Sequence, residues 1–369
     1  MQTPHVNIGE LGTPAPLIDV DIMARNIGRV VQMCRAAGVS YRPHAKTHKI
    51  PALAHQQVRA GAVGITCAKI GEAEVMARGG LRDIFIAYPV VGCSQFHRLA
   101  ALSKSVNLSV GVDSLDVAEA MSQFCASQGV SFNIMLEVDT GHRRCGVIPE
   151  QAEEVAEILV TLAGLRLKGI FTHEGQVYLP GSQEQRLALA NQAGRALADV
   201  GRRLMCRGIS IETVSVGSSP GLDAACRVDG VNENRPGTNI FNDCTQVHLG
   251  ACRWEDCALT YYCTVVSRPA PDRAIIDGGS KTFSSDRLSD WPYYGAIIGY
   301  PGIRFTFASE EHGILRLECD SARGLKIGDR LRVIPSHACG SINLHDRVYL
   351  TRGEDVVDEL KVEARGCVR

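Results

Sequence analysis

Residues 42–49 read Arg-Pro-His-Ala-Lys-Thr-His-Lys and place a lysine, Lys46, where a short extended segment gives way to a loop. A lysine in that position can be desolvated, lose its proton near neutral pH and attack a carbonyl carbon to form a Schiff base. The alternative is a solvated loop lysine, because lysines are mostly exposed. The fold predicted around this stretch decides between the two.

Eight short apolar runs rich in β-branched residues alternate with longer amphipathic segments along the first two thirds of the chain. This alternation is typical of βα units around a parallel sheet. The predicted strands are 41–46, 62–67, 84–88, 106–112, 132–139, 167–173, 212–217 and 233–241, and helical spacing is clearest in 51–60, 70–79, 116–128, 149–162 and 183–205. Eight strands indicate a (β/α)₈ barrel of the TIM type, with a doubly wound sheet as the alternative fold.

The residues at the strand ends favour the barrel. Functional groups of such barrels lie at the carboxyl ends of the strands, where the loops converge on one mouth. Polar, charged or glycine residues stand at nearly every predicted strand end, among them Lys46, Lys69, Tyr88, Asp113, Asp139, His173, Gly217 and Gly237.

From residue 259 onward, apolar and polar residues alternate between turns, without long helical stretches. This pattern predicts strands of a separate, antiparallel β domain. We expect a barrel over residues 20–245 and a β domain over residues 246–369, with residues 1–19 packing against the β domain.

Two small-residue loops stand at the ends of the last two barrel strands. Gly217 and Ser218 follow the seventh strand, and Gly237 and Thr238 lie on the eighth. Loops at these two positions of a barrel form a recurrent phosphate site, because backbone N–H groups can approach closely there. A phosphate anchor opposite a reactive lysine is the layout that pyridoxal 5'-phosphate requires. The alternatives are tight turns without a ligand and an ion pair between Lys46 and Asp139.

His337 and Cys339 stand two residues apart on an extended segment of the β domain, so their side chains point the same way. Imidazole and thiolate suit zinc, with manganese or magnesium as alternatives. A closed structural site needs four ligands, whereas two ligands with open positions suit a catalytic metal. His345 and Asp346 are weaker candidates, expected to be surface or hydrogen-bonding residues.

Composition limits the class of partner. The 39 Lys and Arg residues against 40 Asp and Glu give a formal net charge of -1, so no overall field favours nucleic acid or an anionic membrane. No apolar run approaches the length of a membrane span, and the first residues do not resemble a secretory signal. We expect a cytoplasmic protein that acts on a small molecule, with most of its 14 cysteines as buried thiols.

Five segments together carry a family resemblance: residues 42–49, 141–147, 216–220, 311–313 and 335–339. With them the chain resembles the two-domain, fold-type III pyridoxal phosphate enzymes related to alanine racemase, in the branch of the D-serine dehydratases and D-threonine aldolases. The resemblance extends from Thr13 to Gly366.

The resemblance implies a role for each candidate residue and a homodimer. Lys46 would be the Schiff-base lysine, and His337 and Cys339 would hold a metal beside the substrate hydroxyl. Arg235 resembles the arginine that alanine racemases place on the pyridine nitrogen, although relatives with metal sites often lack it. The residues implied to contact the cofactor are Lys46, Arg144, Tyr178, Gly217, Ser218, Gly237 and Thr238, of which Lys46, Arg144 and Tyr178 would also act in catalysis.

Two positions separate the branches of this family. The aldolases usually carry an aspartate where this chain has Cys339 and a histidine base where it has Val177, whereas the dehydratases resemble this chain at both. We therefore expect a metal-assisted lyase of D-configured β-hydroxy amino acids, a D-serine-type dehydratase that gives a 2-oxo acid and ammonia. The alternatives are retro-aldol cleavage to glycine and an aldehyde, racemisation, and a non-catalytic pyridoxal phosphate carrier.

Overall fold

The computed structural model describes residues 6–319 and 323–369. The chain forms two compact units. The barrel unit comprises residues 29–46, 51–237 and 367–369, and the sheet unit comprises residues up to 28, 47–50 and 238–366. The chain passes from one unit to the other at several points, including the peptide bonds after Lys46 and after Gly237.

The barrel unit contains eight parallel strands in the order β3-β10-β9-β8-β7-β6-β5-β4. A parallel bridge between His44 and Thr66 joins the two ends of this order, so the sheet closes. The strands are β3 (Ser40–Tyr41), β4 (Ile65–Cys67), β5 (Asp83–Pro89), β6 (Asn107–Val112), β7 (Phe132–Glu137), β8 (Leu165–Phe171), β9 (Thr213–Val216) and β10 (Glu233–Asn234). The predicted barrel of eight parallel strands is confirmed.

The first and last strands are much shorter than predicted. β3 ends at Tyr41, and the Lys46 segment is a 3₁₀ turn, η2 (Ala45–Thr47). β10 ends at Asn234, before Pro236, which cannot donate a ladder hydrogen bond. The polar groups of both segments therefore lie in loops.

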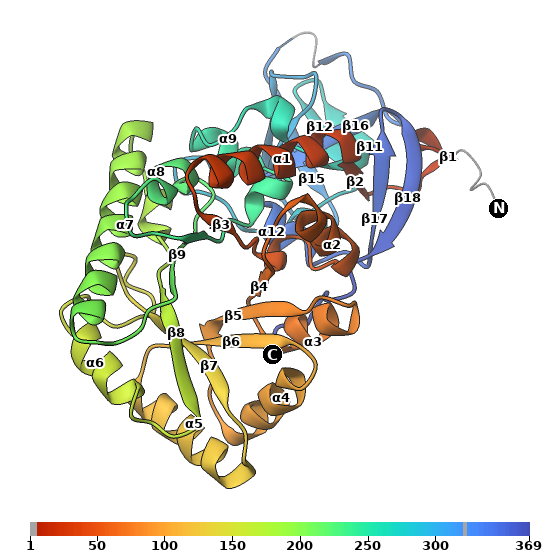
Figure 1. The fold of residues 1–369 in the computed structure, drawn as a ribbon. Helices are drawn as coiled ribbons and strands as arrows, with labels where there is room; N and C mark the ends of the chain where they lie inside the picture. Colours follow the sequence, from red (N-terminus) through yellow and green to blue (C-terminus); the bar gives the residue numbers. More distant parts are fainter. Residues whose placement is uncertain (1–5, 320–322) are drawn as a thin grey trace. The chain divides into compact units, whose positions relative to one another are not determined.

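Helices lie outside this sheet, as Figure 1 shows for α3 to α7. The longest, α7, begins at a capping box in which Ser182 and Gln185 bond each other's backbone N–H groups. Its buried face includes Ala190, Leu197 and Leu204, which pack into the main core of the unit. The helices are α2 (Pro51–Ala60), α3 (Ile70–Arg78), α4 (Cys93–Ser103), α5 (Leu115–Gln128), α6 (Ala152–Leu159), α7 (Gln183–Cys206) and α8 (Leu222–Cys226), with α1 (Val20–Ala36) leading in from the sheet unit.

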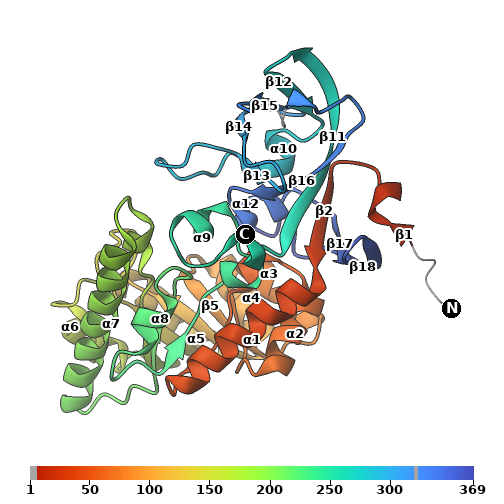
Figure 2. The ribbon, with the colours of Figure 1, turned by 90° about the horizontal axis from the view of Figure 1, so that it is seen from above.

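The sheet unit contains a ten-stranded sheet in the order β1-β18-β17-β2-β11-β12-β15-β14, with β16 and β13 branching from β11. Figure 2 shows the long strand β11 beside β2 and β16. The strands are β1 (Val6–Asn7), β2 (Ala15–Asp19), β11 (Leu259–Ala270), β12 (Arg273–Ile276), β13 (Gly295–Ile297), β14 (Ile303–Ala308), β15 (Gly313–Leu317), β16 (Arg330–Pro335), β17 (Arg347–Arg352) and β18 (Asp355–Lys361). Among the described residues, the short helices α9 (Cys244–His248), α10 (Ser280–Phe283) and α12 (Ala338–Ile342) accompany them.

Two features of this sheet differ from the expectation. The pair β2 and β17 is parallel, whereas the remaining pairs among the described residues are antiparallel, so the sheet is mixed. Strand β13 was not predicted, because three residues beginning with Gly295 show no alternation of apolar and polar side chains.

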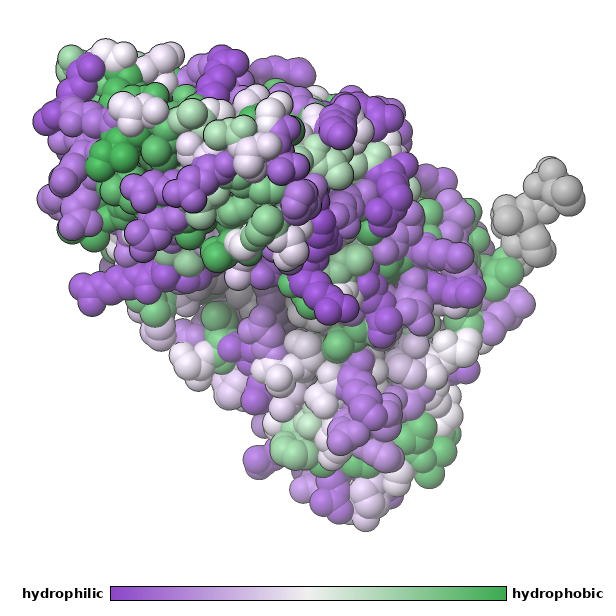
Figure 3. Space-filling view, turned by 90° about the horizontal axis from the view of Figure 1, so that it is seen from below, coloured by the Kyte–Doolittle hydropathy of each residue, from purple (hydrophilic) through white to green (hydrophobic). Residues whose placement is uncertain are grey.

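Hydrophilic and hydrophobic residues are interspersed on the face of the molecule that Figure 3 shows. Among the described helices, none combines the length and the apolar character that crossing a bilayer requires.

Candidate active site

Lys46 lies half-buried in the 3₁₀ turn after β3. No described residue forms an ion pair with it within 4.0 Å, and the alternative partner Asp139 instead accepts hydrogen bonds from the backbone N–H groups of Gly141 (2.9 Å) and Arg143 (3.0 Å). Two neighbouring lysines are engaged: Lys49 Nζ donates to the Ala364 carbonyl (3.4 Å), and Lys69 Nζ lies 3.5 Å from the centre of the Tyr88 ring. Of these three lysines, Lys46 is the one whose amine has no ion-pair, hydrogen-bond or ring partner among the described residues.

Two histidines, His44 and His173, lie near this lysine in the barrel unit, and a third, His142, contacts His173. Burial, followed by the positive charge of Lys46, lowers the pKa of His44 and of His173 well below the ordinary value. The His173 Nδ1–H donates to the Gly217 carbonyl (2.8 Å), and its ring centre lies 5.3 Å from that of His142. Burial also lowers the pKa of His142. These imidazoles are therefore neutral near pH 7.

Tyr178 ends the 3₁₀ turn η3 (Gly175–Tyr178) and lies half-buried, with its ring centre 6.5 Å from that of His173. The preceding residue, Val177, is fully buried in the barrel core. The position that holds a histidine base in the aldolases is therefore a packing position in this chain.

Arg144 is half-exposed, and its guanidinium lies 3.8 Å from the buried carboxylate of Glu137 at the end of β7. Burial raises the pKa of Glu137 to about 7, although Arg144 and Arg235 oppose that shift. Ligand-type atoms of Asp113, Glu137 and Cys145 all lie within 4.8 Å of one another beside this pair. The sequence does not predict a role for Glu137, because a glutamate that ends a strand gives no sign of what it faces.

The loops after β9 and β10 offer unused hydrogen-bond donors. The backbone N–H groups of Ser218, Ser219 and Gly237 have no acceptor among the described residues, and Ser218 is buried. The N–H of Gly217 donates to Glu174 Oε2 (2.9 Å), and a Cβ at Gly217 would lie 2.8 Å from the Cβ of Arg235. N–H groups without protein partners, here one buried and two partly buried, suit an anion, so these loops fit a phosphate.

Arg235 lies buried beside the contacting rings of Phe85 and Phe171, with its guanidinium carbon 5.6 Å and 5.2 Å from their centres. Its Nε donates to Ser215 Oγ (2.7 Å), and its Nη2 donates to the Thr172 carbonyl (2.6 Å). Nη1 has no acceptor among the described residues, so one end of the guanidinium remains available.

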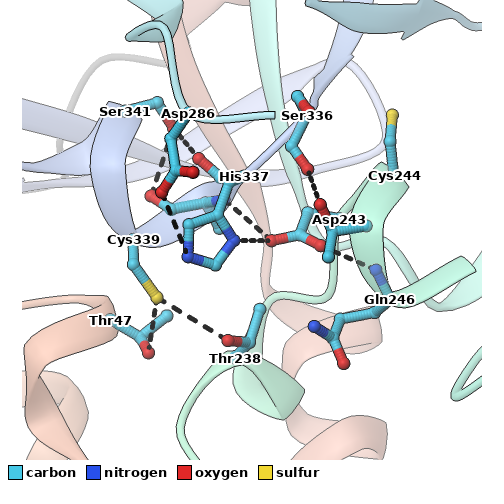
Figure 4. A network of polar contacts seen from close by, with 12 residues as sticks. Thr47, Thr238, Asp243, Cys244, Gln246, Asp286, Ser336, His337, Cys339 and Ser341 are labelled. Atoms are coloured by element: carbon cyan, nitrogen blue, oxygen red, sulfur yellow. Dashed lines mark hydrogen bonds and ion pairs between the residues drawn. The ribbon is translucent and has the colours of Figure 1, made fainter. Parts of the chain in front are cut away.

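The sheet unit holds the predicted metal-binding pair (Figure 4). His337 Nδ1–H donates to Asp243 Oδ2 (3.0 Å), which also accepts from the Ala338 N–H (2.8 Å). Asp243 Oδ1 accepts from the Gln246 N–H (2.9 Å) and so caps helix α9. The buried carboxylate fixes the ring orientation and leaves His337 Nε2 as the free ligand atom, an arrangement typical of metal-binding histidines.

The thiol of Cys339 lies 3.2 Å from Thr47 Oγ1 and 3.6 Å from Thr238 Oγ1, as Figure 4 shows. Burial lowers the pKa of His337, but the charges of Cys339 and Asp243 outweigh burial and raise it well above the ordinary value. Asp286 Oδ2 lies 4.0 Å from His337 Nε2. Among the described residues, no third His, Cys, Asp or Glu has a ligand atom within 4.8 Å of those of both His337 and Cys339, so a metal held here keeps open positions.

The two weaker candidates serve other purposes. His345 bonds to the Thr282 carbonyl (3.0 Å), and Asp346 pairs with Arg365 (3.0 Å). Asp243, in contrast, was missed, although an aspartate three residues before Gln246 is the kind of N-cap signal that a sequence can show.

Comparison with known proteins agrees with this arrangement. Residues 18–244 match the model of the alanine racemase N-terminal domain, and residues 258–351 match that of a putative serine dehydratase domain. D-threo-3-hydroxyaspartate dehydratase from Delftia sp. (strain HT23) is 36% identical over 350 residues, which cover 90% of this chain and 92% of the relative.

Two solved structures share the fold over nearly the whole chain. D-threonine aldolase from Filomicrobium marinum superposes with a TM-score of 0.91 at 30% identity and covers 99% of both chains. A cysteine-to-alanine mutant of D-threo-3-hydroxyaspartate dehydratase, in its metal-free form, gives a TM-score of 0.90 at 33% identity and covers 96% of this chain and 98% of its own. The chain belongs to the fold-type III pyridoxal phosphate enzymes with an alanine racemase-like barrel, in the branch of the D-serine dehydratases and D-threonine aldolases.

Proposed function

We propose that the protein is a metal-assisted, pyridoxal phosphate-dependent lyase that dehydrates D-configured β-hydroxy amino acids to 2-oxo acids and ammonia. The observation that carries this proposal is the pair His337 and Cys339, with His337 oriented by the buried Asp243. The similar dehydratase with a cysteine replaced, which is known in a metal-free form, supports a metal function for Cys339.

The residues of the barrel unit suit the cofactor. Lys46 has an amine without an ion-pair partner in the described chain, and Ser218, Ser219 and Gly237 provide N–H groups without acceptors. Lys46 would hold the cofactor covalently, and the two loops, including Gly217 and Thr238, would hold its phosphate. When bound, pyridoxal phosphate supplies an electron sink next to the α-carbon of the substrate.

Lys46 would take the α-proton on Nζ, because an amine freed from the cofactor is a base of suitable strength. His44 and His173, neutral because of burial, would surround Lys46 without adding positive charge. Arg144 and Tyr178 would position the cofactor and the substrate carboxylate, with Glu137 holding the guanidinium. His337 Nε2 and Cys339 Sγ would hold the metal, which supplies Lewis acidity for a leaving hydroxyl.

Dehydration is favoured over retro-aldol cleavage by two positions. Cleavage of the Cα–Cβ bond requires a base for the β-hydroxyl proton, and buried Val177 cannot provide one. Elimination requires instead that the hydroxyl leave, which a metal on an imidazole and a thiolate assists.

The aldolase remains the second candidate because of one observation. His142 and His173 lie with ring centres 5.3 Å apart, and burial lowers the pKa of both, so a neutral imidazole is available as a base. A racemase would need no metal at the β-position, and a carrier would need neither the metal pair nor its supporting carboxylate.

Product analysis tests the proposal. D-Serine should give pyruvate, D-threonine should give 2-oxobutanoate, and D-threo-3-hydroxyaspartate should give oxaloacetate, each with one ammonia. Glycine and an aldehyde as the main products would show that the protein is an aldolase and not a dehydratase. Loss of optical activity without ammonia would indicate a racemase, and absence of any reaction would leave only the carrier.

We further propose a zinc ion, because a thiolate with an imidazole favours zinc over manganese or magnesium. We also propose that the protein is a cytoplasmic homodimer. Elemental analysis of the purified protein identifies the metal, and sedimentation equilibrium gives the number of subunits. Full activity of a monomer would show that catalysis does not require a dimer.

A further inference from the structure

The residue after the candidate Schiff-base lysine, Thr47, has no role in the function proposed above. It is completely buried and belongs, with residues 48–50, to the sheet unit. Two contacts hold this short segment. The Ile50 N–H donates to His48 Nδ1 (3.0 Å), and Lys49 bonds Ala364 through its side chain (3.4 Å) and through its backbone carbonyl (3.0 Å). Thr47 therefore begins an anchored segment.

The backbone of Lys49 shows how firmly this segment is held. Its φ of 58° lies in the left-handed region, which a residue with a side chain adopts at a cost in free energy. Such a conformation persists only where the surrounding structure holds it. The paired hydrogen bonds to Ala364 provide that hold, so the position of the nearby Thr47 hydroxyl is fixed.

The Thr47 hydroxyl faces a candidate metal ligand. Its Oγ1 lies 3.2 Å from Cys339 Sγ, and Thr238 Oγ1 lies farther from the same sulfur, at 3.6 Å (Figure 4). Among the described residues, Thr47 Oγ1 has no other hydrogen-bond partner. A buried hydroxyl requires a partner, and here that partner is the sulfur.

Metal binding decides which of the two atoms donates. In the free protein either the thiol or the hydroxyl can be the donor. A cysteine that binds a metal has lost its proton, so its sulfur can only accept. The Thr47 O–H is then the donor, and a hydrogen bond to a charged acceptor is roughly twice as strong as one between neutral groups.

We infer that Thr47 is a positioning residue of the metal centre, whose hydroxyl donates to the Cys339 thiolate and fixes the sulfur for metal binding. Asp243 has the corresponding place behind His337, so each of the two ligands has a buried hydrogen-bond partner. The alternative is a hydroxyl that contributes only to packing of the sheet unit. The inference rests on the proposed metal function of Cys339.

The affinity for zinc is the first test, measured by chelator competition on the complete, cofactor-loaded protein. Thr47→Val keeps the shape of the side chain and removes the donor, so zinc should bind about tenfold more weakly, as is usual when a partner of a metal ligand is lost. Thr47→Ser restores the hydroxyl and should restore most of the affinity. Thr351→Val is the matched control, because Thr351 is also completely buried in the sheet unit but donates to the Ile18 carbonyl (3.4 Å). It should bind zinc like the wild type.

Cobalt spectroscopy separates a bond to the sulfur from mere packing. Co²⁺ in place of zinc gives an absorption band in which charge moves from the thiolate to the metal. Loss of a hydrogen bond to the sulfur makes this transfer easier, so the band of Thr47→Val should move to longer wavelength. Thr47→Ser and Thr351→Val should keep the wild-type band, and a threonine that only packs would leave it in place.

Wild-type zinc affinity together with an unmoved cobalt band in Thr47→Val would overturn the inference. Cys339→Ala separates this outcome from failure of the proposed function. If zinc binding depends on Cys339 but not on Thr47, the inference alone fails. If Cys339→Ala binds zinc like the wild type, the proposed metal function fails and the inference fails with it. Thr47→Ala carries the same expectations as Thr47→Val and replaces it if valine prevents folding.

Discussion

At the scale of single residues, the central prediction concerns Lys46. Borohydride reduction of the purified, yellow protein should attach the cofactor permanently to the peptide that contains Lys46, because its amine has no ion-pair partner among the described residues. Lys46→Ala should lose more than about 10³-fold in turnover, since both covalent attachment and proton abstraction depend on one amine. Peptide mapping by mass spectrometry is the measurement.

The matched control is Lys69→Ala, which removes a lysine that lies over the Tyr88 ring. It should retain the attached label and most of the activity. A label on Lys49 or Lys69 would contradict the assignment, and absence of any label would contradict the cofactor.

Glu137 gives a prediction about pH. Burial raises its pKa from 4.5 to about 7, so the folded protein prefers the protonated form. The stabilisation of the folded protein by protonated Glu137 is therefore fully present below pH 4.5 and is lost as the pH rises through about 7. A shift of this size corresponds to at most about 3 kcal/mol of unfolding free energy.

Glu137→Gln should remove this dependence of stability on pH. Between pH 5 and 8 the wild type should therefore lose unfolding free energy relative to the variant. Urea unfolding across that range measures it, with the exposed Glu154→Gln as control. Identical pH profiles for Glu137→Gln and wild type would show that Glu137 does not titrate there.

Some of these residues could be recognised from the sequence, and others could not. Lys46, His337 and Cys339 could be singled out from the sequence, because lysine, imidazole and thiol carry characteristic chemistry in recognisable surroundings. Glu137 and Asp243 could not, because their importance arises from what they contact: Arg144 lies seven positions away from Glu137, and His337 lies 94 positions away from Asp243. The roles of all these residues in catalysis stay predictions.

At the scale of elements, Asp243 links the start of helix α9 to the turn that holds His337 and Cys339. Asp243→Ala removes both the cap and the carboxylate behind the imidazole. We expect the affinity for zinc to fall 10- to 100-fold, as is usual when the carboxylate behind a metal-binding histidine is lost. The loss of the cap should lower the unfolding free energy by about 1 kcal/mol.

Asp243→Asn separates the two effects. Asparagine is also a good N-cap, so its one oxygen can still accept from the Gln246 N–H, but its NH₂ group would face the N–H donors of His337 and Ala338. Competition with a zinc chelator should therefore show weakened metal binding in both variants. Unchanged zinc affinity in Asp243→Ala would exclude His337 as a ligand oriented by this carboxylate.

Element boundaries show where the sequence pattern was insufficient. Predicted helices agree with α2, α3, α5, α6 and α7 within a few residues, because each buries one apolar stripe. The first and eighth barrel strands end early, at Tyr41 and Asn234, where the chain enters the turn of Lys46 and the loop of Gly237. The residues beyond these ends are buried but do not pair as strands. Periodicity alone does not distinguish such buried loop residues from residues of a strand.

At the scale of the whole molecule, β2 lies between β11 and β17, although its partners are more than 240 residues away in the sequence. Nothing in residues 15–19 indicates which strands they join, because short apolar runs pair in many ways. Leu17 and Ile18 of β2 are completely buried. Removing this strand would leave β11 and β17 with unpaired backbone groups and exposed apolar side chains.

The last prediction follows from this position of β2 in the sheet unit. A fragment of residues 238–369 should aggregate, whereas co-expression with residues 1–28 should yield a soluble complex with a cooperative thermal transition. Residues 1–28 with Leu17→Asp and Ile18→Asp should fail to rescue, because a charge cannot be buried there without a partner. Circular dichroism and gel filtration measure both properties. A cooperative transition of residues 238–369 alone would show that the sheet folds without β2.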